Sequence, residues 1–292
     1  MGIGTVLGLG QGMPDPFLET PEVVLIQGDA LQSMEAMADQ SIDCVSTSPP
    51  YFGLRDYGVR GQYGSEASPA EYVSRLVRLF SEVFRVLSDE GTLWLNIGDS
   101  YRDKNLLGIP WKVAFALQDS GWILRNDIIW HKTNAMPFSG KDRLSNRFEH
   151  VFLFTKKKKY VFDLDSVREK CVSTPDRNGR NALRGQKSLR ASGPNSGQYG
   201  EYKNPGDVWS ISTRPFPEAH LAVQSPELAE RCVRAGSRAG GIVLDPFSGT
   251  GTTGAAALKH GRKYVGIDLN REYLDLSVRT RLAPYLTRNE EK

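Results

Sequence analysis

Hydrophobic positions along the 292-residue chain alternate between strand-like and helix-like patterns. Short apolar runs predict buried strands at 23–26, 42–47, 91–97, 242–245 and 264–268, in a run that ends at 127–130, and in further β runs at 151–154 and 160–162. Helical periodicity predicts helices at 31–38, 69–87, 110–118, 226–234, 252–259 and 271–282. This alternation of strands and helices predicts an α/β fold with a doubly wound, mostly parallel sheet.

The periodicity disappears between residues 172 and 205, where Gly, Ser, Asn, Arg and Pro dominate. Such a stretch inside a compact domain is usually functional or disordered. From Lys156 to Lys203 there are twelve Lys or Arg against five Asp or Glu, a local excess of seven positive charges, whereas the whole chain carries +3. This charge predicts a region that faces the phosphates of a nucleic acid. A flexible linker is the alternative, and a solvated turn is the alternative for 156–159 alone.

Composition limits the location and the kinds of site. Hydrophobic residues make up 39% and charged residues 24% of the chain, which is ordinary for a soluble globular protein. No apolar run reaches the roughly 18 to 20 residues that span a bilayer, and no signal peptide pattern is present, so we expect a cytoplasmic protein without a membrane partner. Cys44, Cys171 and Cys232 are widely spaced, without a Cys-x-x-Cys motif or a His cluster. The sequence therefore predicts neither disulfides nor a metal site.

The most informative segment is 47–51, with the sequence Thr-Ser-Pro-Pro-Tyr, at the end of a predicted strand. Two consecutive prolines fix φ and remove two backbone donors, so the carbonyls around Ser48 and Pro49 are left to accept hydrogen bonds. An exocyclic NH2 group has two hydrogens to donate. Tyr51 supplies a flat face for a heterocycle, as expected where a nucleobase is held outside its helix. The segment is interpreted as a clamp for a planar amine, and a strand-ending turn is the alternative.

A second candidate site is the segment 245–253, with the sequence Asp-Pro-Phe-Ser-Gly-Thr-Gly-Thr-Thr. A hydrophobic strand leads into a glycine turn and the start of a small-residue helix, which is where ligands bind in open α/β sheets. Asp268 ends the next predicted strand, 23 residues after Asp245. A carboxylate at that place can accept hydrogen bonds from the two hydroxyls of a ribose. A tight turn shaped by Gly249 and Gly251, without a ligand, is the alternative.

The ligand of this second site is narrowed by motifs that the chain lacks. The spacing differs from the Gly-x-Gly-x-x-Gly of dinucleotide sites, and no Gly-Lys-Ser/Thr is present to hold a triphosphate. Nicotinamide and ATP cofactors are therefore disfavoured. A nucleoside without phosphates, with one carboxylate at its ribose and Asp245 near a cationic or amino-acid end, is S-adenosylmethionine.

The two motifs together resemble those of the amino-group DNA methyltransferases, in the circularly permuted (beta) class whose catalytic motif precedes the cofactor motif. The resemblance covers residues 23–282. It includes the segments 95–101, 110–118, 128–132 and 206–209, which are similar to segments of bacterial and phage members of the family. One departure is 221–227, where the family has a more aromatic approach to the Pro-Glu pair. The resemblance implies a Rossmann-like methyltransferase fold with an inserted target-recognition region, acting on double-stranded DNA with S-adenosylmethionine.

The resemblance also implies roles for individual residues. In the family, the side chain at Ser48 and the carbonyl of Pro49 accept hydrogen bonds from the target amine, and Tyr51 stacks on the flipped base. The predicted catalytic residues are Ser48, Pro49, Pro50 and Tyr51. The predicted cofactor-binding residues are Asp29 (at the adenine amine), Thr47, His220, Asp245, Pro246, Phe247, Ser248, Gly249, Gly251, Thr252 and Asp268. The predicted DNA-binding residues are Phe52, Arg55, Lys132, Arg143, Arg177, Arg180, Arg184, Lys187 and Arg190. Core packing is the alternative for Phe52, and a structural hydrogen bond is the alternative for His220.

Ser48 favours cytosine N4 as the target atom, because family members that methylate adenine N6 more often carry Asp or Asn there. Adenine N6 methylation is the nearest alternative. Cytosine C5 methylation requires a nucleophilic thiol, typically in a Pro-Cys pair, and the chain has no such dipeptide. A non-catalytic DNA-binding protein on the same fold is an alternative of another class. A homodimer and a companion restriction endonuclease are further candidate partners.

Four parts are expected along the chain: an N-terminal extension (1–22), a catalytic half (23–165), a target-recognition insertion (166–212) and a cofactor-binding half (213–292).

Overall fold

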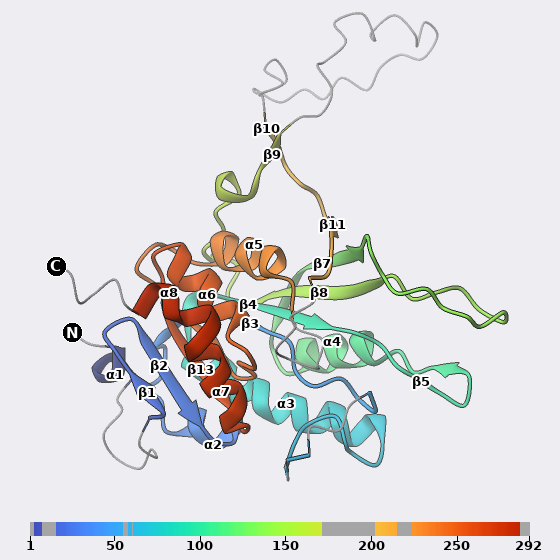
Figure 1. Ribbon diagram of the computed structural model, residues 1–292, viewed down its shortest axis with the longest axis horizontal. Helices are drawn as coiled ribbons and strands as arrows, with labels where there is room; N and C mark the ends of the chain where they lie inside the picture. The colour runs from blue at the N-terminus through green and yellow to red at the C-terminus, as the bar shows by residue number, and fades with distance from the viewer. Residues whose placement is uncertain are drawn as a thin grey trace, which may run out of the picture.

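The computed structural model describes residues 3–7, 16–54, 58–59, 61–170, 202–214 and 224–286 (Figure 1). Across these ranges the centre is a nine-stranded sheet with the order β1-β2-β13-β12-β3-β4-β8-β7-β11. Its strands are β1 (Leu18–Glu19), β2 (Val23–Gln27), β3 (Ile42–Thr47), β4 (Leu87–Ile97), β7 (Ile123–Lys132), β8 (Phe148–Thr155), β11 (Val208–Ile211), β12 (Ile242–Asp245) and β13 (Lys263–Asp268).

Strand directions place the two sequence motifs at one edge of the sheet. The neighbours β2, β13, β12, β3 and β4 are parallel to one another, so their carboxyl ends meet at the same edge. β8 runs antiparallel between β4 and β7, β11 is parallel to β7, and β1 is antiparallel to β2. Because β12 and β13 lie between β2 and β3, the two ends of the chain share one sheet. The predicted doubly wound, mostly parallel sheet is confirmed.

Helices cover both faces of the sheet. Successive strand residues point to opposite sides, and both sides of the buried strands are apolar, so each face packs against helices. Val24 and Ile26 lie in one core cluster and Val23 and Leu25 in the other. The first cluster contains residues of α1 (Ile3–Val6), α2 (Ala30–Glu35), α3 (Pro69–Val86) and α4 (Ile109–Asp119). The second contains residues of α5 (Pro226–Gly236), α6 (Thr252–Lys259), α7 (Arg271–Ser277) and the π-helical turn Val278–Leu282, and α8 (Ala283–Leu286) follows. The result is three layers with the sheet in the middle (Figure 1).

Local signals explain where the longest helix begins. The Ser68 side chain accepts a hydrogen bond from the Glu71 N–H, and Pro69 occupies the first turn, where a missing N–H costs nothing. Tyr72, Leu76 and their successors at helical spacing are buried against the sheet. α3 is therefore fixed at its first turn and along one face, which matters because Tyr72 contacts the 47–51 segment.

Small elements project beyond the sheet. β5 (Tyr101–Arg102) pairs with β6 (Asn105–Leu106), and β9 (Glu169–Lys170) pairs with β10 (Tyr202–Lys203) after the short 3-10 helix Asp165–Val167. The β9/β10 pair rises above the body of the molecule in Figure 1, whereas β5 lies at its right side. Within the described residues, no helix is long and apolar enough to cross a membrane.

Several expected elements differ in the structure, and two of the differences have a local explanation. Residues 160–162 form no strand: the Val161 N–H donates to the Glu90 carbonyl at 2.8 Å, without a ladder to either side. An apolar run alone does not supply a neighbouring strand. The helix expected at 31–38 begins at Ala30 and ends at Glu35. It begins there because the Asp29 carboxylate accepts from the Gln32 N–H at 3.1 Å.

The expected boundaries at residues 22 and 212 do not coincide with the packing. Ile3 and Leu7 are fully buried in the first core cluster, and β1 extends the central sheet. β11 also belongs to that sheet, with Trp209 and Ile211 buried. The expected division of the chain into four parts stays a prediction. Most of the expected insertion, residues 171–201, lies outside the described residues, together with Arg177, Arg180, Arg184, Lys187 and Arg190.

Candidate active site

The 47–51 segment leaves β3 and is held by hydrogen bonds from distant elements. The Ser48 hydroxyl donates to Tyr51 Oη at 3.2 Å, and Tyr51 Oη donates to Glu149 Oε2 of β8 at 2.7 Å. The Tyr72 hydroxyl on α3 donates to the Pro50 carbonyl at 2.9 Å. Tyr72 therefore fixes the turn at Pro50, and the interpretation of Ser48 and Pro49 as an amine clamp stays a prediction.

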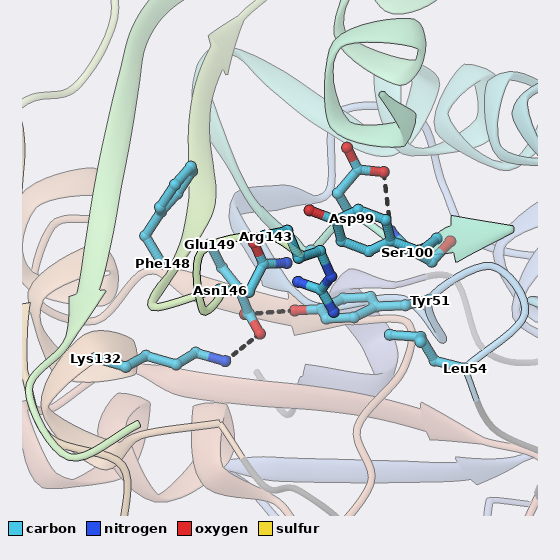
Figure 2. A pocket seen from close by; sticks show the side chains of 11 residues that line it. Tyr51, Leu54, Asp99, Ser100, Lys132, Arg143, Asn146, Phe148 and Glu149 are labelled. Carbon is cyan, nitrogen blue, oxygen red and sulfur yellow. Dashed lines mark hydrogen bonds and ion pairs between the residues drawn. The ribbon is translucent and has the colours of Figure 1, made fainter. Parts of the chain in front are cut away.

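A cavity of about 410 Å³ opens beside this turn, at the carboxyl end of the sheet (Figure 2). Its lining residues are Tyr51, Leu54, Gly98, Asp99, Ser100, Tyr101, Lys132, Arg143, Asn146, Phe148 and Glu149. The glycine at position 98 makes room for the Tyr51 ring, because a Cβ there would lie 2.7 Å from Cε2 of Tyr51. The volume is within the range of small-ligand pockets, about 300 to 1,000 Å³.

Glu149 is the centre of the polar contacts in this cavity. Lys132 Nζ forms an ion pair with Glu149 Oε1, and Asn96 Nδ2 donates to Oε2 at 3.0 Å. Figure 2 shows Tyr51 and Lys132 both pointing at this carboxylate. Glu149 and Asn96 were not among the residues predicted from the sequence. The available signal was a carboxylate near the start of a mostly apolar strand.

Tyr51 is fixed as a neutral donor. Burial, and after it the negative charge of Glu149, raise the pKa of Tyr51 well above its usual value. Its ring lies against Gly98 and its hydroxyl is bonded at both sides. The predicted stacking on a base stays a prediction, and it applies to a ring whose orientation is already set.

The second motif is joined to the first by a direct hydrogen bond. Thr47 Oγ1 donates to Asp245 Oδ1 at 2.7 Å across 198 residues of sequence, and the Phe247 N–H donates to the same oxygen at 3.1 Å. Burial raises the pKa of Asp245 to about 6, although these hydrogen bonds oppose the shift. The 47–51 segment and the glycine turn are therefore adjacent in the structure.

Asp268 at the end of β13 organises the glycine turn. Its carboxylate accepts from the Gly249 N–H at 2.7 Å and from the Asn270 N–H at 2.8 Å. Burial raises the pKa of Asp268 to about 6. Gly251 has φ 76°, in the left-handed region that favours glycine, and α6 begins directly after it.

The remaining predicted cofactor residues surround these two carboxylates. Asp29 lies at the end of β2 and begins α2, and Phe247 packs edge-on against Tyr63 with ring centroids 5.3 Å apart. Burial and then the charge of Asp29 raise the pKa of Tyr63 to about 12, and Tyr63 was not among the residues predicted from the sequence. The Ser248 hydroxyl is 2.8 Å from Tyr264 Oη. Pro246 follows Asp245 in this turn.

These residues fit S-adenosylmethionine by their chemistry. The buried carboxylate of Asp245 and the partly buried carboxylate of Asp268 can face the cationic end and the ribose hydroxyls of such a ligand. Among the described residues, the hydroxyl oxygens of Thr250 and Thr252 are buried and have no hydrogen-bond partner. His220 lies outside the described residues, so its expected role here stays a prediction.

The predicted DNA-binding residues divide into three groups. Lys132 and Arg143 both line the cavity, and the Arg143 guanidinium stacks over Tyr101 and Phe138 at 4.0 and 3.9 Å from the ring centroids. Phe52 is a correction: it is 1% exposed and packs against Tyr72 in the core, which is the alternative stated for it. It therefore offers no surface to DNA. Arg55 and the five basic residues of the insertion are outside the described part of the chain.

Comparison with known proteins identifies relatives along most of the sequence. Residues 42–279 match the N6/N4 DNA methylase family. The Type II methyltransferase M.SmaI of Serratia marcescens is 42% identical over 282 residues, covering 87% of this chain and 88% of M.SmaI. The Type II methyltransferase M.Cfr9I of Citrobacter freundii is 40% identical over 290 residues, covering 89% of this chain and 88% of M.Cfr9I.

Solved structures show the same fold. The PvuII DNA methyltransferase (cytosine-N4-specific) is similar with a TM-score of 0.69 and 21% identity, covering 88% of this chain and 85% of that chain. A putative DNA modification methylase of Thermus thermophilus, TTHA0409, solved in complex with S-adenosyl-L-methionine, has a TM-score of 0.60 and 26% identity, covering 90% and 95% of the two chains. With the family match over residues 42–279, this chain belongs to the N6/N4 DNA methylase family and uses S-adenosylmethionine as its cofactor.

Proposed function

We propose that the protein transfers a methyl group from S-adenosylmethionine to the N4 amine of a flipped cytosine in double-stranded DNA. The observation that carries the proposal is the Thr47–Asp245 hydrogen bond, which joins the amine clamp to the cofactor turn. Target amine and methyl donor would then occupy adjoining spaces. Ser48 supports cytosine over adenine, since the family places Asp or Asn there more often in adenine N6 enzymes. The structurally similar PvuII DNA methyltransferase is cytosine-N4-specific, which agrees with this choice.

The chain's own residues would bind and orient the reactants. Asp268 would accept hydrogen bonds from the ribose hydroxyls, Asp245 would face the cationic end of the cofactor, and Asp29 would accept from the adenine amine. When bound, S-adenosylmethionine supplies an electrophilic methyl group. Ser48 Oγ and the Pro49 carbonyl would accept the two N–H groups of the target amine. This directs the nitrogen lone pair toward the methyl group, so positioning and charge complementarity lower the barrier.

We also propose the permuted class, because the clamp after β3 precedes the cofactor turn after β12 along the chain. Action in the cytoplasm, a homodimer and a companion restriction endonuclease are part of the same proposal. The relatives' names as Type II methyltransferases support the last of these.

The test is to incubate purified protein with unmethylated DNA and S-adenosylmethionine, digest the DNA to nucleosides, and identify the modified base by mass spectrometry. N4-methylcytosine is the expected product. N6-methyladenine instead would replace the cytosine proposal with the adenine alternative. No methylated nucleoside across varied DNA sequences, despite cofactor binding, would indicate a non-catalytic DNA-binding protein.

A further inference from the structure

Three side chains beside the cavity form a continuous chain of hydrogen bonds. Ser48 Oγ lies 3.2 Å from Tyr51 Oη, and Tyr51 Oη lies 2.7 Å from Glu149 Oε2. Ser48 is on the turn that would grip the target amine, whereas Glu149 is on β8, and both contact the hydroxyl oxygen of Tyr51. Figure 2 shows the contact between Tyr51 and Glu149. The chain therefore connects the clamp to a charged group that does not itself belong to the motif.

The number of protons fixes the direction of each hydrogen bond. A carboxylate only accepts, so Tyr51 must donate its single phenolic proton to Glu149. Ser48 must then donate its single hydroxyl proton to Tyr51, because Tyr51 has no second proton to give. The Ser48 oxygen is left with lone pairs alone toward any further partner. In this arrangement Ser48 can accept from an amine N–H but cannot present a proton to it.

Glu149 is held in place from two neighbouring strands. Lys132 of β7 pairs with one carboxylate oxygen, and Asn96 of β4 donates to the other at 3.0 Å while also donating to the His150 carbonyl at 3.1 Å. Opposite charge and a second donor keep the carboxylate pointed at Tyr51. The orientation of Glu149 is thus set independently of any ligand.

The other carboxylate in the cavity does not compete for this role. Asp99 accepts from the backbone N–H groups of Ser100, Gly108 and Ile109 at 2.8 to 3.0 Å, where α4 begins. Its oxygens are therefore engaged with the helix start. Among the described residues that line the cavity, Glu149 is the carboxylate that is bonded to the hydroxyl chain.

We infer that Glu149 is a positioning residue for methyl transfer: through Tyr51 it turns the Ser48 proton away from the target amine and leaves Ser48 as a hydrogen-bond acceptor. The inference rests on the proposed function only in that the target is an exocyclic amine, cytosine N4 or adenine N6. It also gives the Tyr51 hydroxyl a task that stacking of its ring does not require. A phenylalanine at position 51 would stack equally well and would lack this link.

The inference makes different predictions for two single variants. Glu149→Gln offers an N–H group to Tyr51 when its amide oxygen is drawn to Lys132, so the Tyr51 proton turns toward Ser48 and the Ser48 proton toward the amine. We expect a fall of about tenfold or more in the single-turnover rate, the effect of one charge-assisted hydrogen bond. Tyr51→Phe frees the Ser48 hydroxyl to rotate, so the rate should fall less.

The experiment measures single-turnover methylation at saturating DNA and S-adenosylmethionine for Glu149→Gln, Tyr51→Phe and the double variant, with cofactor Kd and Tm for each. In the Tyr51→Phe background, Glu149→Gln should add little, because the link it acts through is gone. Cofactor Kd should be unchanged in all three. Glu230→Gln is the matched control. Glu230 on α5 also forms an ion pair with a lysine, with 2.8 Å between Glu230 Oε1 and Lys259 Nζ, and neither residue lines the cavity.

A wild-type rate in Glu149→Gln would overturn the inference, and so would rate losses that multiply in the double variant. A rate loss explained by a lower Tm or by weaker cofactor binding would assign Glu149 a structural role instead. The wild-type product, identified in parallel, separates this result from the proposed function: N6-methyladenine contradicts the cytosine proposal while leaving the double-variant comparison intact. Absence of any methyl transfer by the wild type contradicts both.

Discussion

The two ends of the candidate site are built in different ways. At the cofactor end, the carboxylate of Asp268 is held by backbone N–H groups of Gly249 and Asn270, which belong to loops at the ends of parallel strands. At the target end, Ser48 and Tyr51 are held by side chains from β8 and, through Glu149, from β4 and β7. The first end depends on local loop geometry and the second on long-range side-chain contacts.

This difference divides the expected effects of substitution. Changes at the glycine turn should alter cofactor affinity, because the groups there would hold the ligand in its ground state. Changes at the amine clamp should alter the rate of transfer, because contacts to the reacting nitrogen become strongest in the transition state. The Thr47–Asp245 hydrogen bond is the place where the two behaviours meet.

The largest effect is expected for Ser48→Ala. Removing the acceptor of the target amine should lower the transfer rate by about 100-fold or more, in the range seen when one preorganised transition-state contact is lost. Cofactor Kd should change little, since Asp245 and Asp268 are intact. Single-turnover kinetics and calorimetric titration with S-adenosylmethionine measure the two quantities. An equal loss of cofactor affinity would contradict the division between the two ends.

Asp268→Ala should give the opposite result. Loss of a charged hydrogen-bond acceptor should weaken cofactor binding by about 10- to 100-fold, while the rate at saturating cofactor should change less. Asp268→Asn keeps one oxygen for the Gly249 N–H and separates ligand contact from loop distortion. Asp275→Ala, at an exposed position of α7, is the control. Unchanged cofactor affinity in Asp268→Ala would place the ribose contact elsewhere.

The same difference decides how much the sequence could predict. Asp245, Gly251 and Asp268 are recognisable because their roles follow from short-range order: a strand, a turn and the next strand. The fold class was predictable for the same reason, from alternating periodicities. Glu149 was not, because its partners Tyr51 and Asn96 are 98 and 53 residues away in the chain. They meet only because β8 lies antiparallel between β4 and β7, and hydrophobic periodicity does not specify strand order.

Lowering the pH should weaken cofactor binding with a midpoint near pH 6. Burial raises the pKa of Asp245 and Asp268 to about 6, so both carboxylates take up protons as the pH falls from 7 to 5. Ionised carboxylates are the forms that accept from ribose hydroxyls and attract a cation, so the affinity should fall by at least about tenfold over this range.

The free energy of unfolding depends on pH in the opposite direction from the cofactor affinity. The folded state retains these protons at pH values where the unfolded chain has lost them, so the free energy of unfolding decreases as the pH rises toward 6. Calorimetric titration with S-adenosylmethionine from pH 5 to 8 measures the affinity, and thermal unfolding without ligand measures the second trend. Asp268→Asn should flatten part of the affinity profile. An affinity that is constant across this range would contradict the assigned contacts.

The smallest effect is expected where the target end meets solvent. The connection between β7 and β8 projects from the sheet (Figure 1), and it carries Met136 and Leu144, which are 87% and 90% exposed, next to Arg143 at the cavity. Isolated apolar side chains at such a rim have no packing role in the folded chain, so Leu144→Ser should leave Tm and cofactor Kd unchanged. If DNA covers this rim during transfer, loss of the apolar contact should raise KM for DNA about three- to tenfold, equivalent to partial burial of one leucine.

Arg143→Ala should raise KM as well, and more steeply at low salt, because a phosphate contact is screened by ions whereas an apolar contact is not. A Leu144→Ser enzyme with wild-type KM at every salt concentration would restrict the DNA contact of this end to the charged residues.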